Sequence, residues 1–150
     1  NHLRPLDDGT ITKSAACMVA NLRLLRGQRE KMSAAKTMLE LIESRLRAQS
    51  YYNIIANIRG DSMESVAALV NENPAVSGMQ GPTVSRVFSK EGSGDWFSVS
   101  VVVEVTRLTG SVDYLRGIGA SGVVVTPAHY VFDHESEAFE RLKGAVEVVS

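Results

Sequence analysis

The order of short strand-like and helical segments between residues 51 and 126 constrains the fold more than any other feature of this sequence. β-branched and aromatic residues favour strands over residues 51–58, 83–89, 96–105 and 122–126. A helix capped by Asp61 or Ser62 separates the first two strands, and a helix near residues 110–118 separates the last two. The order strand, helix, strand, strand, helix, strand predicts an α+β, ferredoxin-like βαββαβ domain.

Further segments flank this unit on both sides. Residues 22–49 are rich in helix-forming residues and contain no proline, so we expect one long helix there. Residues 135–147 predict a last helix, with Phe139, Leu142 and Val146 on one face. The small residues of 10–20 suit either a buried strand or a helix.

Composition excludes several classes of partner. Sixteen Lys and Arg against 17 Asp and Glu leave a formal charge of −1, which gives no basic surface for nucleic acid or acidic lipid. The apolar runs are shorter than the roughly 20 residues of a membrane span. We therefore expect no nucleic-acid and no membrane partner.

No catalytic or metal-binding residues are predicted. His129 and His134, beside Asp133 and Glu135, offer nitrogen and oxygen ligands for a metal. A turn with a solvated acidic helix cap is the preferred interpretation, because a structural zinc site needs a fourth converging ligand. The single cysteine, Cys17, has no basic neighbour to lower its pKa and is interpreted as a packing residue.

Two glycine-containing segments are candidates for ligand contact. Gly81, Pro82 and Thr83 lead into one predicted strand, and residues 119–122 lead into another. Turn chemistry explains each segment without a ligand, as a turn before a strand and as a glycine cap of a helix. A strand end with open backbone amides is also where a small ligand can approach closely.

These segments, with Asn57, Ile58, Arg59 and Gly60 upstream and residues 129–133 downstream, resemble the C-terminal regulatory domain of long-form ATP phosphoribosyltransferase. The residues of these segments are most similar to those of the plant and algal type of the enzyme. The resemblance implies that residues 1–50 are a remnant of the catalytic half, with a strand at 10–20, and that residues 51–150 are the regulatory domain. Because the sequence opens without Met, we expect a processed product or a fragment.

The resemblance also implies a function. The parent enzyme joins ATP to phosphoribosyl pyrophosphate with Mg²⁺ in the first step of histidine biosynthesis, and histidine inhibits it by binding the regulatory domain. The resemblance further implies a homo-oligomer, dimeric or hexameric, in the cytoplasm or, for a plant or alga, in the chloroplast. The catalytic phosphate-binding loop of the family is not in this sequence, so we expect the chain alone to be inactive.

Position by position, the resemblance assigns the histidine-binding residues. They are Thr83, Val102, Ser121, Gly122, Thr126 and Arg59. Ser121 and Thr126 offer hydroxyl groups. Arg59 and Asn57 lie where some relatives place an acidic residue or a histidine, so the partner of the ligand's ammonium group is left open.

Two other functions fit the same fold. One is a stand-alone sensor of a small molecule without a catalytic partner, which would have no need of residues 1–50. The other is an RNA-binding domain, which would need aromatic residues on central strands and a basic surface. The strand begins with alternation but ends in consecutive valines at 101–103, which predicts that both of its faces are apolar there, that Val101 or Val103 points outward, and that the chain self-associates.

Overall fold

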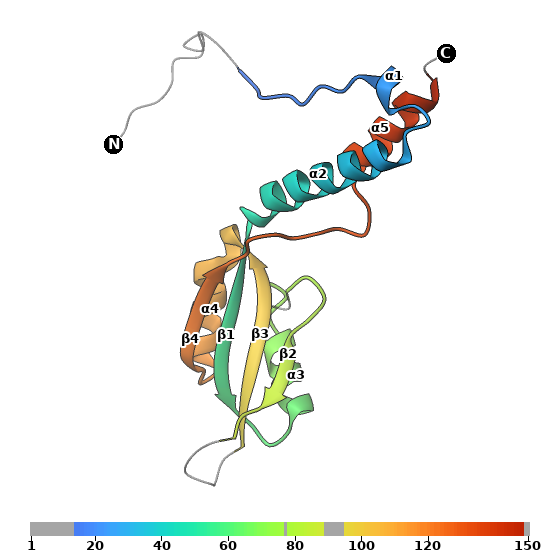
Figure 1. Cartoon of the computed structure of the whole chain (residues 1–150). Helices are drawn as coiled ribbons and strands as arrows, with labels where there is room; N and C mark the ends of the chain where they lie inside the picture. Colours follow the sequence, from blue (N-terminus) through green and yellow to red (C-terminus); the bar gives the residue numbers. More distant parts are fainter. Residues whose placement is uncertain (1–13, 77, 89–94, 149–150) are drawn as a thin grey trace, which may run out of the picture.

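The computed structural model describes residues 14–76, 78–88 and 95–148, which form a four-stranded sheet, two helices against it and a helical arm (Figure 1). The strands are β1 (Tyr51–Arg59), β2 (Thr83–Arg86), β3 (Trp96–Glu104) and β4 (Ser121–Pro127). They lie in the order β2-β3-β1-β4, and every neighbouring pair is antiparallel. This is the predicted ferredoxin-like arrangement, and the α+β class is confirmed.

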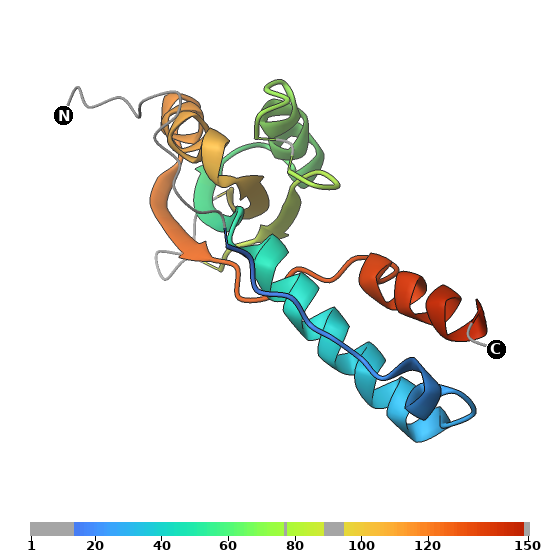
Figure 2. The same ribbon diagram turned by 90° about the horizontal axis from the view of Figure 1, so that it is seen from above.

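The two crossover helices are α3 (Met63–Asn71) and α4 (Leu108–Gly117), which lie on the same face of the sheet (Figure 2). Ser62 caps α3 as predicted: its hydroxyl accepts a hydrogen bond from the Ser65 amide, and the Ser65 hydroxyl accepts one from the Ser62 amide, both at 3.1 Å. A 3₁₀ turn, η1 (Val105–Arg107), lies between β3 and α4.

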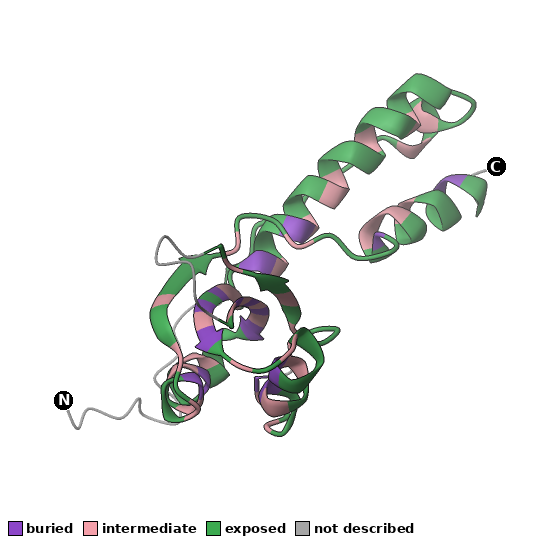
Figure 3. Cartoon of the chain, turned by 90° about the horizontal axis from the view of Figure 1, so that it is seen from below, coloured by how far each residue is buried: buried purple, intermediate pink, exposed green. Residues whose placement is uncertain are grey.

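The hydrophobic core fills the space between the sheet and these two helices (Figure 3). Alternate residues of β1 and β3 enter it, including Ile54 and Phe97, and meet Val66 of α3 and Leu115 of α4. Val101 and Val103 both belong to this set, with 2% and 3% of their surface exposed.

One prediction about β3 is therefore wrong. Neither Val101 nor Val103 points outward, because both share a side of the strand with buried Phe97 and Val99. The opposite side carries Ser98 and Ser100 and then Val102, so both sides of the strand are apolar at the valine run. The run of valines hides a strict alternation that the valine spacing alone does not reveal.

The arm consists of α1 (Leu22–Leu25), α2 (Arg29–Ala48) and α5 (Glu137–Val148). The single helix expected over 22–49 is interrupted, since Gly27 between α1 and α2 has a φ of +71°. No strand is found in residues 14–20, because the described part of the chain gives this segment no strand to pair with; residues 10–13 lie outside that part.

Residues 128–136 connect β4 to α5 and lie against the last turns of α2 (Figure 2). The guanidinium groups of Arg45 and Arg47 donate to the carbonyls of His129 and Val131, at 3.2 and 3.1 Å. Helix α5 packs against α2 and not over the sheet. Among the residues that the structure describes, no helix covers the other face of the sheet, and the arm extends from the end of the sheet (Figure 1).

Candidate functional site

The open face is the side of the sheet opposite α3 and α4. Because directly paired residues share a face, the strand pairing defines its members. They are Tyr51, Asn53, Ile55, Asn57 and Arg59 of β1, Thr83 and Ser85 of β2, Trp96, Ser98, Ser100, Val102 and Glu104 of β3, and Ser121, Gly122, Val124 and Thr126 of β4. Hydroxyl and amide groups predominate, which suits a small polar ligand better than a buried core.

Three of the six predicted site residues gather near the arm, and we call Thr83, Val102 and Thr126 the arm-end group. Val102 and Thr126 flank Asn53 from both sides, since each is its directly paired residue. Thr83 pairs with Ser100, whose hydroxyl donates to the Asn53 side-chain oxygen at 2.9 Å. The folded sheet thus places these three predicted residues on the open face.

The other three, Arg59, Ser121 and Gly122, form the far-end group. Ser121 pairs with Asn57, where the register of β1 and β4 shifts. Gly122 has a φ of +60°, and a Cβ placed on it would lie 3.7 Å from the Asn57 side-chain nitrogen. The guanidinium carbon of Arg59 lies 4.7 Å from the centre of the Trp96 ring, in a cation–π contact.

The two groups lie at different heights along the strands of the sheet. Asn53 marks the arm-end group and Asn57 the far-end group. Four residues of strand separate them by about 13 Å. The structure thus spreads the predicted residues along one face of the sheet.

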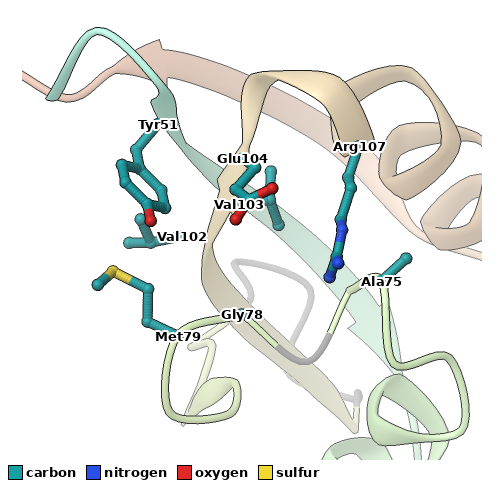
Figure 4. Close-up of a pocket in the computed structure, with 8 residues that line it drawn as sticks. All are labelled: Tyr51, Ala75, Gly78, Met79, Val102, Val103, Glu104 and Arg107. Carbon is teal, nitrogen blue, oxygen red and sulfur yellow. The ribbon is translucent and has the colours of Figure 1, made fainter. Parts of the chain in front are cut away.

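A hollow adjoins the arm-end group (Figure 4). Strand β2 pairs with β3 only from Thr83 onward, so the last residues of β3 have no strand on that side, and the loop before β2 packs there instead. A Cβ on Gly78, at φ +68°, would lie only 3.2 Å from the Val102 carbonyl oxygen. The hollow measures about 150 Å³ and is lined by Tyr51, Ala75, Gly78, Met79, Val102, Val103, Glu104 and Arg107.

Charges of both signs line this hollow. Glu104 lies between the Tyr51 ring and the Arg107 side chain in Figure 4, with Met79 near Tyr51. The Glu104 carboxylate accepts a hydrogen bond from the Thr106 hydroxyl at 3.4 Å. The Arg107 side chain forms no ion pair within 4.0 Å among the residues that the structure describes.

Of the residues that line this hollow, only Val102 was predicted as a site residue from the sequence. The large or charged side chains that were missed are those of Tyr51, Met79, Glu104 and Arg107. A signal was present, because an acidic residue ends β3 and a basic residue follows within one turn. A second hollow of about 350 Å³ shares Tyr51 and Glu104 and reaches Arg47 at the base of the arm.

Other titratable groups do not form a site. Within residues 14–76, 78–88 and 95–148, no three His, Cys, Asp or Glu side chains converge on a point that could hold a metal ion. Burial raises the pKa of Tyr114, and the negative charge of Glu72 adds to the shift. The Tyr114 hydroxyl donates to the Leu69 carbonyl at 2.6 Å and so joins α4 to α3, on the side away from the open face.

The fold and the open face define an α+β protein of the ferredoxin-like class. Residues 48–130, over half of the chain, match the family described as HisG, C-terminal domain, and the chain belongs to this family. The match begins at the end of α2 and runs through all four strands. It ends before α5 begins.

Curated relatives match a longer part of the chain. ATP phosphoribosyltransferase 1, chloroplastic, and ATP phosphoribosyltransferase 2, chloroplastic, both from Arabidopsis thaliana, are 34% and 33% identical to it over 145 residues. ATP phosphoribosyltransferase of Methanosarcina acetivorans is 30% identical over 128 residues. These alignments cover 95%, 95% and 85% of this chain. The chain spans only 35% to 40% of the relatives' own length.

Proposed function

We propose that this chain is the C-terminal part of an ATP phosphoribosyltransferase and carries its site for feedback inhibition by histidine. The observation that supports this most is the match of residues 48–130 to the HisG C-terminal family. The parent enzyme joins ATP to phosphoribosyl pyrophosphate in the first step of histidine biosynthesis. Residues 1–50 belong to its catalytic half and residues 51–150 to its regulatory domain.

The open face supports the histidine part of the proposal. A free amino acid needs acceptors for its ammonium group, donors for its carboxylate and a shaped surface for its side chain. The arm-end group and the adjoining hollow offer hydroxyl groups, a carboxylate and a guanidinium. Inhibition follows if histidine binds one arrangement of the parent's subunits more tightly than another.

Further properties of the parent belong to the same proposal. Its reaction uses Mg²⁺ together with the two phosphorylated substrates. Its subunits form dimers or hexamers, and it works in the chloroplast if the source is a plant or alga. The word chloroplastic in the names of two relatives supports that compartment. Among the described residues, no helix is long and apolar enough to cross a membrane.

The catalytic part of the proposal is tested by a turnover assay. The chain alone, with ATP, phosphoribosyl pyrophosphate and Mg²⁺, should form phosphoribosyl-ATP only at the background rate. The reason is that the phosphate-binding loop expected of the family is not in its sequence. Robust turnover by the purified chain would place catalytic residues in the part proposed as regulatory.

The effector part is tested by thermal unfolding with and without ligand. L-Histidine should raise the midpoint in a concentration-dependent way, because a ligand that binds only the folded state stabilises it. Alanine and lysine at the same concentrations serve as controls. A stand-alone sensor of another small molecule is the second candidate, and it gains support if histidine has no effect while a different amino acid or nucleotide does.

A further inference from the structure

The two outer edges of the sheet differ in how well they are protected from pairing with another chain. Strand β2, at one edge, has only 4 residues and ends in Arg86, and both short length and charge discourage pairing. Strand β4 forms the opposite margin of the sheet (Figure 1) and has 7 residues without a charged side chain. Its bulge and its proline lie at its two ends, so the middle of β4 is a regular, uncharged edge.

The pairing of β4 with β1 shows which backbone groups of β4 face outward. The Ala128 amide donates to the Tyr51 carbonyl at 3.1 Å, so these two residues form a hydrogen-bonded pair of the antiparallel ladder. Bonded and non-bonded pairs alternate along such a ladder, so the residues two and four places before Ala128 also direct their backbone groups to β1. The N–H and C=O groups of the intervening Val125 and Val123 therefore point to the outer edge of the sheet.

These outward groups are complementary to the same groups of a second copy. If two β4 strands run antiparallel about a two-fold axis, Val125 of each chain faces Val123 of the other, and about four backbone hydrogen bonds form. Val124 then meets its own counterpart on the axis, in a non-bonded pair, where side chains lie closest. Its side chain lies on the open face with 53% of its surface exposed, so this contact removes apolar surface from water. Because β4 carries no charge, no like charges meet across the axis.

We propose that β4 is a subunit contact at which two copies of this chain join their sheets, with the strands antiparallel and Val124 on the two-fold axis. A second copy fits better than an unrelated peptide, because β4 is complementary to itself in both its hydrogen bonds and its side chains. The contact closes after two chains, since the β2 edge that remains is short and charged. The proposal goes beyond the proposed function and holds whether or not the chain binds histidine.

Disulfide cross-linking tests the register of this contact. Every variant carries Cys17→Ser, which removes the native cysteine. With oxidised glutathione, Val124→Cys should form a covalent dimer, because the Cα atoms of a non-bonded pair lie about 4.5 Å apart, within reach of a disulfide. Thr126→Cys should not cross-link, since it faces Gly122 of the other copy and lies about 13 Å from its own counterpart. Ser85→Cys, exposed on the β2 edge, is the control for random collision.

A proline at position 125 tests the outward amide by itself. Val125→Pro removes an N–H that β1 does not use, so the chain should keep its fold. Each dimer loses the hydrogen bonds donated by both Val125 amides, so its dissociation constant should rise roughly 10- to 100-fold. Val125→Ala is the matched control, because it shortens the same side chain and keeps the amide. Analytical ultracentrifugation measures the dissociation constant, and circular dichroism verifies the fold.

The expected result is cross-linking of Val124→Cys alone, together with weaker dimers for Val125→Pro than for Val125→Ala. If Val124→Cys cross-links no better than Ser85→Cys or Thr126→Cys, the proposal is overturned. It is also overturned if a folded Val125→Pro chain dimerises as tightly as Val125→Ala, because the copies then meet through another surface. If Val125→Pro does not fold, the cross-linking result decides by itself.

Discussion

Gly122 has a backbone conformation that other residues adopt only at a cost. Its φ of +60° lies in the left-handed region, where a Cβ costs roughly 1–2 kcal/mol. We predict that Gly122→Ala lowers the free energy of unfolding by about 1 kcal/mol, and that Gly122→Asn costs less, since asparagine tolerates this region. Urea unfolding measures both, and a stability equal to wild type for Gly122→Ala would contradict the assigned backbone.

The same position bears on the site. The resemblance places Gly122 among the effector-binding residues, so Gly122→Leu should abolish histidine binding while the domain stays folded. Unchanged affinity in a folded Gly122→Leu variant would remove Gly122 from the site.

Tyr114 gives the fold a dependence on alkaline pH. Its pKa is raised above 10.0 by burial and by Glu72. The unfolded chain therefore loses this proton at lower pH than the folded chain does. The contribution to stability is complete below pH 10.0 and is lost as the pH rises through the raised pKa.

The corresponding variant is Tyr114→Phe, which also removes the hydrogen bond to the Leu69 carbonyl. It should cost about 1 kcal/mol at neutral pH. It should also show a smaller decline in stability above pH 10.0 than the wild type. Urea unfolding at a series of pH values is the measurement, and identical pH profiles for the two proteins would refute the assignment.

At the scale of elements, Glu43 fastens α5 to α2. Its carboxylate accepts hydrogen bonds from the Ser136 hydroxyl and, at 2.8 Å, from the Ala138 amide at the start of α5. A carboxylate at a helix N-terminus is also favoured by the helix dipole. Glu43→Ala should therefore loosen α5 by about 1–3 kcal/mol, because two donors lose a charged acceptor.

Hydrogen exchange distinguishes this local effect from general unfolding. Amides of α5 should exchange faster in Glu43→Ala while amides of β1 and β3 keep their protection. Glu40→Ala is the control, since Glu40 pairs with Lys36 on the same helix and exposed pairs contribute little. Equal loss of protection in α5 and in the sheet would contradict the local role of Glu43 in holding α5 to α2.

The elements of the sheet domain were predictable because local signals agreed with the packing. Ser62 caps α3, and β-branched residues form each strand, so sequence and fold point the same way. The division of 22–49 at Gly27 was missed, because a glycine inside a helical pattern is often tolerated.

The site was only partly predictable. The resemblance assigns residues to a face one by one, but their distances depend on strand register. That Val102 and Thr126 both pair with Asn53 is a property of the folded sheet. The hollow was missed for the same reason. It exists because the pairing of β2 with β3 starts at Ser100 and leaves the end of β3 without a neighbouring strand on that side.

At the scale of the whole molecule, the open face has an apolar centre. Ile55 and Val124 pair across β1 and β4 with 39% and 53% of their surface exposed. We expect this face to support self-association and Val124→Lys to weaken it, because a charge there is costly to bury. Light scattering coupled to size exclusion measures the mass. Val101→Lys should instead unfold the domain, since Val101 is buried.

The self-association prediction can be contradicted by one result of the light-scattering measurement. A wild-type chain that stays monomeric at high concentration, with and without histidine, would contradict the role of this face as a subunit contact.

The central claim is that this chain carries the effector site of an ATP phosphoribosyltransferase on the open face of its sheet. The most direct test is an NMR titration of the ¹⁵N-labelled chain with L-histidine. The account predicts saturable amide shifts that concentrate in the strands of the open face, at Thr83, Val102 and residues 121–126, with α5 unaffected. No saturable shift at millimolar histidine, or shifts confined to the arm, would contradict it.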